Sequence, residues 1–116
     1  MNRPIKFRAW RPSFNRFRFF DLSTGFNVEN SDVFPSVEQF TGMLDKEGKE
    51  IYEGDILESV SFHPSAVEYS EELAAFSLAD STQVEVLSVY PNNKWAIIGN
   101  IHENPSILKC TDNLTL

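Results

Sequence analysis

Two segments near the start of the chain alternate between two kinds of side chain, and this alternation limits the possible fold more than any other feature. In IKFRAW (residues 5–10) the odd positions carry Ile, Phe and Ala, and the even positions carry Lys, Arg and Trp. NRFRFFDL (residues 15–22) repeats the pattern with phenylalanines opposite arginines. Side chains of a β-strand point alternately to opposite faces, so both segments are predicted to be half-buried strands. Pro12 and Asn15 between them favour a turn, which predicts a hairpin.

Short apolar stretches bounded by turn residues continue through the rest of the chain and bring the expected total to about seven short strands. Residues 23–37 lack periodicity and predict a long connection. Residues 67–80 are ambiguous, because their middle has helical propensity; we favour two strands around a turn at Glu71 and Glu72. The other expected elements are a strand or helical turn at 37–44, strands at 49–52, 55–62, 82–90 and 94–101, a turn at 63–66, and a helical turn from Asn104 and Pro105.

The size and composition fit one folded domain. The chain has 116 residues, of which 41% are hydrophobic and 23% charged, and it contains ten Phe. A chain of this length buries one core but not two independent ones. The predicted fold class is therefore a mainly β domain, and closure into a barrel would remove exposed strand edges.

Charge is distributed unevenly along the chain. Residues 1–18 contain six basic residues and no acid, whereas residues 19–116 contain four lysines and all seventeen acids. The net charge of -7 argues against nonspecific wrapping of nucleic acid. The basic segment is expected to bind an anion or to lie against the acidic part of its own fold or of a second copy, and we favour the last two.

The basic and aromatic residues of the first two predicted strands are the strongest candidates for a binding site. Single-stranded nucleic acids bind to aromatic side chains flanked by Arg and Lys. Arg8, Trp10, Arg16 and Arg18 provide this combination. The alternative, which we weight more heavily, is that the phenylalanines of these strands form the core and the arginines pair with carboxylates of the acidic remainder. These four residues are therefore a hypothetical binding site, and nucleic acid is the less favoured partner.

The densely charged stretch DKEGKEIYEGDIL (residues 45–57) raises the question of a metal, phosphate or catalytic site. An EF-hand loop that began at Asp45 would need an oxygen ligand and a glycine where Lys49 and Glu50 stand, so calcium is not predicted. A phosphate loop would need more glycines and a following helix. Two turns, at Asp45 to Gly48 and at Glu53 and Gly54, explain the stretch without any ligand.

Catalysis is not predicted from the other residue patterns either. A carboxylate-dependent hydrolase remains a less favoured alternative, and its candidate residues are Glu50, Glu53, Asp55 and Glu58. The two histidines, His63 and His102, lie in separate segments without a cysteine pair, so no metal and no cofactor is expected.

The expected compartment is the cytoplasm. A single cysteine, Cys110, cannot form an internal disulfide. No apolar run approaches the roughly 20 residues that a membrane helix needs, and the N-terminus lacks the apolar region of a signal peptide.

Three segments taken together resemble one protein family. They are IKFRAW at 5–10, QFTGMLDKEGKEIYEGDIL at 39–57 and IGNIHENPSIL at 98–108. Their order and spacing are similar to the signature blocks of the YopX family of phage and prophage proteins, and residues 11–37 and 63–93 show no match. The resemblance implies a C-terminal SH3-like β-barrel (residues 51–116) after an N-terminal β segment and connection (residues 1–50). It implies no established activity and no catalytic residues.

The sequence therefore leads us to expect a non-enzymatic phage or prophage accessory protein in the cytoplasm of a bacterial host. It would act by binding a protein partner or a second copy of itself, as a homo-oligomer without a membrane association.

Overall fold

The computed structural model describes residues 5–23, 37–60, 62–79, 84–87 and 94–108, which form a mainly β protein with a short helix at residues 105–108. Ten strands occur in this part of the chain, which confirms the predicted mainly β class. They are β1 (Lys6–Arg11), β2 (Arg16–Asp21), β3 (Val37–Leu44), β4 (Glu50–Tyr52), β5 (Asp55–Ser59), β6 (Phe62–Ala66), β7 (Glu68–Ser70), β8 (Ala75–Ala79), β9 (Val84–Val86) and β10 (Ala96–Asn100).

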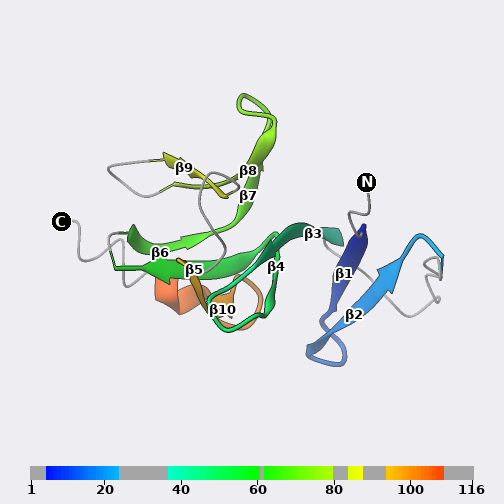
Figure 1. Ribbon diagram of the computed structural model, residues 1–116. Coiled ribbons are helices and arrows are strands. Elements are labelled where there is room, and N and C mark those ends of the chain that lie inside the picture. The colour runs from blue at the N-terminus through cyan, green and yellow to red at the C-terminus, as the bar shows by residue number, and fades with distance from the viewer. Residues whose placement is uncertain (1–4, 24–36, 61, 80–83, 88–93, 109–116) are drawn as a thin grey trace.

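The strands form three antiparallel sheets. Their orders are β2-β1-β3-β4, β10-β5-β6 and β7-β8-β9. Figure 1 shows the β1–β2 hairpin at one side of the molecule, connected to the rest through β3, and the β7–β8 hairpin projecting at the top. The β1–β2 turn points to the opposite, lower end of that view. Two hairpin turns therefore protrude from different ends of the fold.

The predicted hairpins are confirmed. In the first, β1 pairs with β2 from Lys6↔Asp21 to Arg11↔Arg16, and Asn15 adopts a positive φ of 53° in the turn. In the second, the pairs run from Glu68↔Ser77 to Ser70↔Ala75, so the turn occupies residues 71–74, as expected. The predicted helical turn after Asn104 is also present, as the helix at 105–108. The predicted connection at 23–37 and most of the predicted strand at 82–90 lie outside the described residues.

The predicted turn at 63–66 is wrong, because these residues belong to β6. Register pairs join Ile56↔Ala66, Leu57↔Ser65 and Ser59↔Phe62, with a register shift between the last two. Pro64 has no N–H to donate to a ladder, but β6 is the outer strand in the order β10-β5-β6. An edge strand with an irregular register accommodates proline, so the sequence signal for a turn was misleading here.

The assignment of the faces of the first strand also needs correction. We expected phenylalanines to form the core and arginines to pair with surface carboxylates; Arg8 does pair with two carboxylates, but not at the surface. Instead Arg8 and Trp10 are buried, with 5% and 7% of their surfaces exposed, whereas Phe7 of the same strand is only partly buried. On β1, the face that carries charge is thus the face that packs against the rest of the protein. On β2, Phe17 and Phe19 share that face, because they pair with Trp10 and Arg8.

The main apolar core lies within the C-terminal half of the chain. Its side chains contact one another across β4, β5, β6, β8 and the segments at positions 67, 87 and 95. Burial of each large apolar side chain contributes about 1.5–3 kcal/mol relative to exposure. The members are Ile51, Leu57, Phe62, Val67, Leu78, Leu87 and Trp95.

The charged stretch at 45–57 begins with a tightly hydrogen-bonded turn. One carboxylate oxygen of Asp45 accepts hydrogen bonds from the backbone N–H groups of Glu47 (2.9 Å) and Lys49 (2.8 Å). The other oxygen accepts from the N–H of Ile97 at 3.4 Å. Gly48, with a φ of +85°, closes the turn. This confirms the predicted turn and links it to β10.

These hydrogen bonds give Asp45 a pH-dependent role in stability. Burial raises its pKa, but the N–H groups of Lys49, Glu47 and Ile97 more than offset this and hold the pKa below its ordinary value. The ionised carboxylate therefore stabilises the fold fully above its unfolded pKa of about 3.9, and the contribution is lost as the pH falls through the folded pKa.

We expect Asp45→Asn to lower the free energy of unfolding by about 1–3 kcal/mol at pH 7, because these are hydrogen bonds to a charged group. The difference from wild type should shrink as the pH falls below about 4. Urea denaturation across this pH range measures it, with Glu47→Gln, at an exposed position of the same turn, as the control. A difference that stays constant with pH would contradict the assignment.

Gly54 is required by both its backbone and its surroundings. Its φ is +84°, and an added Cβ would lie 2.1 Å from a carboxylate oxygen of Glu38. Gly48 has almost the same φ, but nothing lies within 4 Å of its Cβ position. Substitution of Gly48 therefore tests backbone strain alone, whereas substitution of Gly54 tests strain together with steric overlap.

Gly48→Ala should cost about 1 kcal/mol, through the left-handed backbone alone. Gly54→Ala should cost more, about 3 kcal/mol or above, because Glu38 is buried and ion-paired and so cannot move aside freely. Chemical denaturation of both variants measures the difference. Equal losses would show that Glu38 does not restrict this position.

Candidate functional site

A buried cluster of charged residues joins three strands. The Nε of Arg8 in β1 lies 2.9 Å from a carboxylate oxygen of Glu38 in β3, and its Nη1 lies 2.9 Å from Oδ1 of Asp55 in β5. All three side chains are only 6–7% exposed. The fork of N–H groups on a guanidinium allows one side chain to bind two carboxylates in this way.

Further contacts complete the surroundings of Arg8. Its Nη2 donates to the backbone carbonyl oxygen of Glu53 at 3.0 Å. The guanidinium carbon lies 4.0 Å from the ring centroid of Phe17 and 5.0 Å from that of Tyr52. Such cation–π contacts gain strength when the cation is desolvated. Arg8 is thus fully occupied by contacts within the fold.

The cluster extends to the turn that follows β10. His102 Nε2 lies 3.1 Å from the second carboxylate oxygen of Glu38. The imidazole stacks on Trp10, with ring centroids 5.2 Å apart and planes 8° from parallel. Residues from β1, β3, β5 and the C-terminal turn therefore meet at one place.

Burial changes the ionisation of two members of the site. It raises the pKa of Asp55, and the nearby Arg8 offsets only part of that increase. Burial and the adjacent Glu50 raise the pKa of Tyr52 to about 12. Tyr52 therefore stays a neutral phenol at physiological pH.

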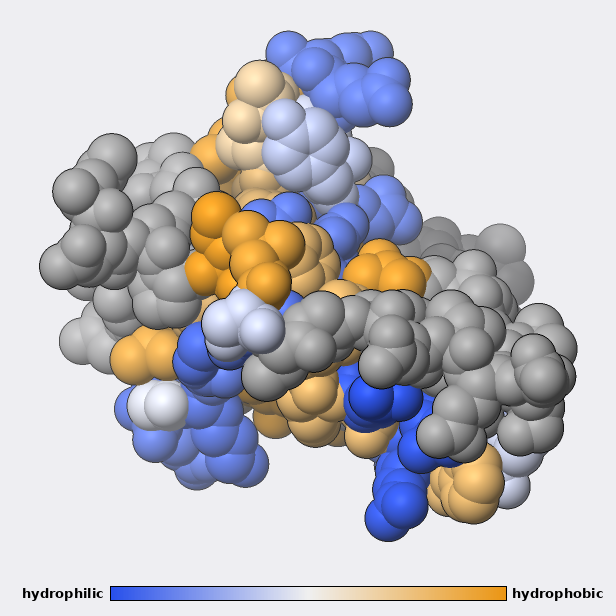
Figure 2. Space-filling model, turned by 90° about the vertical axis from the view of Figure 1, so that its right-hand side faces the viewer, coloured by the Kyte–Doolittle hydropathy of each residue, from blue (hydrophilic) through white to orange (hydrophobic). Residues whose placement is uncertain are grey.

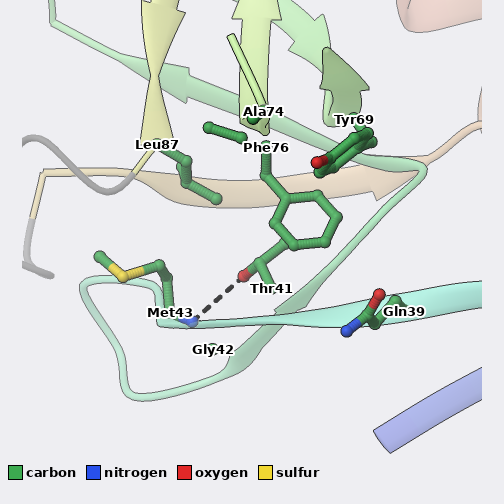
Figure 3. Close-up of a pocket in the computed structure, with 9 residues that line it drawn as sticks. Gln39, Thr41, Gly42, Met43, Tyr69, Ala74, Phe76 and Leu87 are labelled. Carbon is green, nitrogen blue, oxygen red and sulfur yellow. Dashed lines mark hydrogen bonds between the residues drawn. The ribbon is translucent and has the colours of Figure 1, made fainter. Parts of the chain in front are cut away.

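A second site is an open groove of about 460 Å³ between β3 and the β7–β8 hairpin. Figure 3 shows Phe76, Leu87 and Met43 directed into it from different elements, with Tyr69 beside Phe76. The rings of Tyr69 and Phe76 are cross-strand partners with centroids 5.5 Å apart. The full lining is Gln39, Thr41, Gly42, Met43, Tyr69, Ala74, Ala75, Phe76 and Leu87.

The wall formed by β3 starts at Gln39, the last residue of this strand that pairs with β1, and continues to Met43. β1 and β3 pair only over residues 37–39, whereas β3 pairs with β4 at Phe40 and Leu44. In the described part of the chain, most of this wall thus lies past the ladder with β1. Exposed acidic residues lie beside it on the β7–β8 hairpin, at Glu68, Glu71 and Glu72.

Comparison with known proteins identifies the family. The model of the YopX protein family matches residues 22–109, which is most of the chain. This chain belongs to the YopX family. A solved structure, protein EF1440 from Enterococcus faecalis, is similar, with 27% sequence identity and a TM-score of 0.59; the match covers 90% of this chain and 97% of that one. No curated protein matches significantly.

The segment matched by the family model contains most residues of the buried cluster and the whole described lining of the groove. It includes Glu38, Asp55, His102 and every residue that lines the groove, but it begins after β2. Arg8, the cation that binds both carboxylates, therefore comes from a hairpin outside the matched YopX segment. The signature blocks at 39–57 and 98–108 lie inside it, whereas the block at 5–10 lies outside. The match also spans residues 63–93, where the sequence alone showed no resemblance.

The structure divides the four predicted binding residues between two faces of the β1–β2 hairpin. Arg8 and Trp10 lie in the buried cluster. Arg18 is paired with Ala9 and Arg16 with Arg11, on the opposite face. Arg16 is exposed. The four side chains thus do not form one surface in this YopX-family chain.

Of the four carboxylates considered for hydrolysis, only Glu50 and Asp55 line the same hollow among the described residues. Glu50 is paired with Lys6, Glu53 accepts a hydrogen bond from the N–H of Gln39, and Glu58 is exposed. Glu50 and Asp55 both line a shallow hollow of about 370 Å³. Asp55, however, accepts from Arg8 through one oxygen and from the N–H of Tyr52 (2.8 Å) through the other.

Sequence reasoning missed Glu38, His102 and the groove. Glu38 alternates in phase with Phe40, and a carboxylate on an apolar face was the signal for a buried ion pair. Tyr69 and Phe76 flank the β7–β8 turn symmetrically, which was the signal for an aromatic pair.

Among the residues that the structure describes, no three His, Cys, Asp or Glu side chains are grouped to hold a metal ion. None of the described helices has the length and apolar character needed to cross a membrane.

Removal of Arg8 tests the importance of the buried cluster. We expect Arg8→Met to lower the free energy of unfolding by about 3–5 kcal/mol, because two carboxylates would remain buried without their cation. Lys6→Met removes a cation from the same strand, but the Lys6–Glu50 pair is about 40% exposed. That control should cost at most about 1 kcal/mol. Urea denaturation compares the two, and similar losses would contradict the role given to Arg8.

Proposed function

We propose that this YopX-family chain is a phage- or prophage-encoded accessory protein of the bacterial cytoplasm that acts without catalysis, by protein–protein binding and mainly by self-association. The observation that carries the proposal is the groove between β3 and the β7–β8 hairpin. Its lining combines polar surface with the apolar side chains of Met43, Phe76 and Leu87, and among the described residues that line it Tyr69 is the only titratable one. Such a groove suits the binding of a side chain or segment better than acid–base chemistry.

The surroundings of the carboxylates support a non-enzymatic role. Asp45, Glu53 and Asp55 accept hydrogen bonds from backbone N–H groups, and Glu38, Glu50 and Asp55 are ion-paired. A hydrolase would use a carboxylate that can reach substrate, and both oxygens of the buried Asp55 already have partners inside the fold.

We also propose that residues 51–116 form a barrel of the SH3-like type, with residues 1–50 as an N-terminal β segment and connection. The core of seven apolar residues between Ile51 and Trp95 supports one compact body in this region. β4 spans the proposed boundary and pairs with β3 at Tyr52 and Glu50, so the two parts share a ladder. Small barrels of this kind host peptide, protein and nucleic-acid binding alike, so the choice of partner rests on the groove rather than on the fold.

Nucleic-acid binding by the basic N-terminal strands is the alternative. The burial of Arg8 and Trp10 leaves it with Arg16, Arg18 and exposed aromatic residues such as Phe14 and Phe19. A binder of this kind would carry its charge beside a strongly acidic remainder, which repels phosphate.

Size-exclusion chromatography with light scattering tests the proposal. We expect a mass larger than one chain at low salt and a smaller mass at high salt, because oppositely charged surfaces would be screened. A monomer at both salt concentrations would refute self-association. Fluorescence anisotropy with short single- and double-stranded oligonucleotides is the parallel measurement. Salt-sensitive binding there, with a monomeric protein, would favour the nucleic-acid alternative.

A further inference from the structure

The β1–β2 turn presents an exposed aromatic ring between two cations. Phe14 is 52% exposed at the end of the hairpin. The guanidinium carbon of Arg11 lies 4.2 Å from its ring centroid and that of Arg16 lies 5.7 Å away. These contacts restrict the ring before any partner binds. A restricted aromatic anchor loses little conformational entropy on binding, so it is a good contact residue for another protein.

The groove between β3 and the β7–β8 hairpin has the complementary properties. Its volume of about 460 Å³ is within the range of ligand pockets. Met43, Tyr69 and Phe76 provide thioether and aromatic surfaces, with which a phenyl ring interacts favourably. Glu71 and Glu72 are exposed in the adjoining turn, where they would attract cations.

The β1–β2 turn points away from the β7–β8 hairpin that forms one wall of the groove, so the contact we consider is between two chains. Figure 1 places the β1–β2 turn at the lower end and the β7–β8 turn at the top. Figure 2, rotated about the vertical axis, keeps these heights and shows hydrophilic side chains at the top over the β7–β8 turn, above apolar ones. A contact between the turn of one copy and the groove of another is head-to-tail, which builds rings or filaments.

We propose that Phe14 of one copy inserts into the groove between β3 and the β7–β8 hairpin of a second copy. Arg11 and Arg16 then face Glu71 and Glu72 of that copy. This inference rests on the proposed self-association, for which it names the two surfaces. It also explains how the basic start of the chain and its acidic remainder serve one interaction.

The test uses two variants that each disable one side of the contact. Phe14→Ala removes the anchor and keeps the groove. Tyr69→Arg keeps the anchor and places a cation in the groove, where it repels the incoming arginines; Tyr69 is 50% exposed, so the fold tolerates the change. Sedimentation velocity at low salt should show each variant associating about tenfold or more weakly than wild type.

An equimolar mixture of the two variants gives the decisive measurement. The intact anchor of Tyr69→Arg can enter the intact groove of Phe14→Ala, and the complex stops at one contact. At a protein concentration where each variant alone is monomeric, the mixture should therefore form a 1:1 complex. A symmetric contact between two β1–β2 turns would not be restored by mixing, so failure of the mixture to associate overturns the inference.

Two controls match the variants in chemistry but not in position. Leu22→Ala removes an apolar side chain that is 73% exposed, and Val60→Arg adds a cation at a fully exposed site outside the groove. Both should associate like wild type. If wild type associates and neither Phe14→Ala nor Tyr69→Arg weakens it, the named surfaces are wrong but self-association stands. If wild type is a monomer at every salt concentration, both proposals are wrong.

Discussion

The ion pairs of Arg8 hold this structure together, because they connect segments that are far apart in the chain. One guanidinium binds Glu38 and Asp55, and Glu38 in turn contacts His102. Buried charges are tolerated only when their partners satisfy them, so the geometry of the cluster is narrowly defined. As a result, the β1–β2 hairpin is fixed to β5 in the C-terminal half. Its other contacts include a short ladder with β3, contacts with β4 through Lys6 and Phe19, and the stacking of Trp10 on His102.

The same constraint explains why the stretch at 45–57 is so rich in charge and glycine. Asp45 closes a turn and holds β10 through its second oxygen, Gly54 leaves room for Glu38, and Asp55 binds Arg8. Each of these residues serves a contact within the fold. A densely charged stretch can thus serve the fold alone. Carboxylates are needed here because Arg8 is buried, and a buried cation must be paired.

The sequence predicted what is local and missed what depends on distant partners. Alternation identified β1 and β2, turn residues identified the hairpin between them, and strand-forming residues on either side of Glu71 and Glu72 indicated the second hairpin, because these signals act between neighbours. Alternation separates the two faces of a strand but does not say which of them is buried. The face of Arg8 packs inward because Glu38 and Asp55 bind its guanidinium there. The groove was missed because it brings β3 next to the β7–β8 hairpin, which no local pattern reports. Pro64 was misread because only the sheet order shows that β6 is an edge.

The buried cluster also divides the basic residues of the hairpin into two groups with different physical roles. Arg8 faces inward and is satisfied by carboxylates of its own chain, so it contributes little to the outer field. Arg11 and Arg16 flank Phe14 at the turn, and the inward contacts of Arg8 and Trp10 set the direction in which this turn points. Because contacts in the middle of the β1–β2 hairpin hold it in place, the position of its turn is restricted. A restricted surface loses less conformational entropy on binding. The interaction that stabilises the fold is therefore the one that orients the surface we propose for binding.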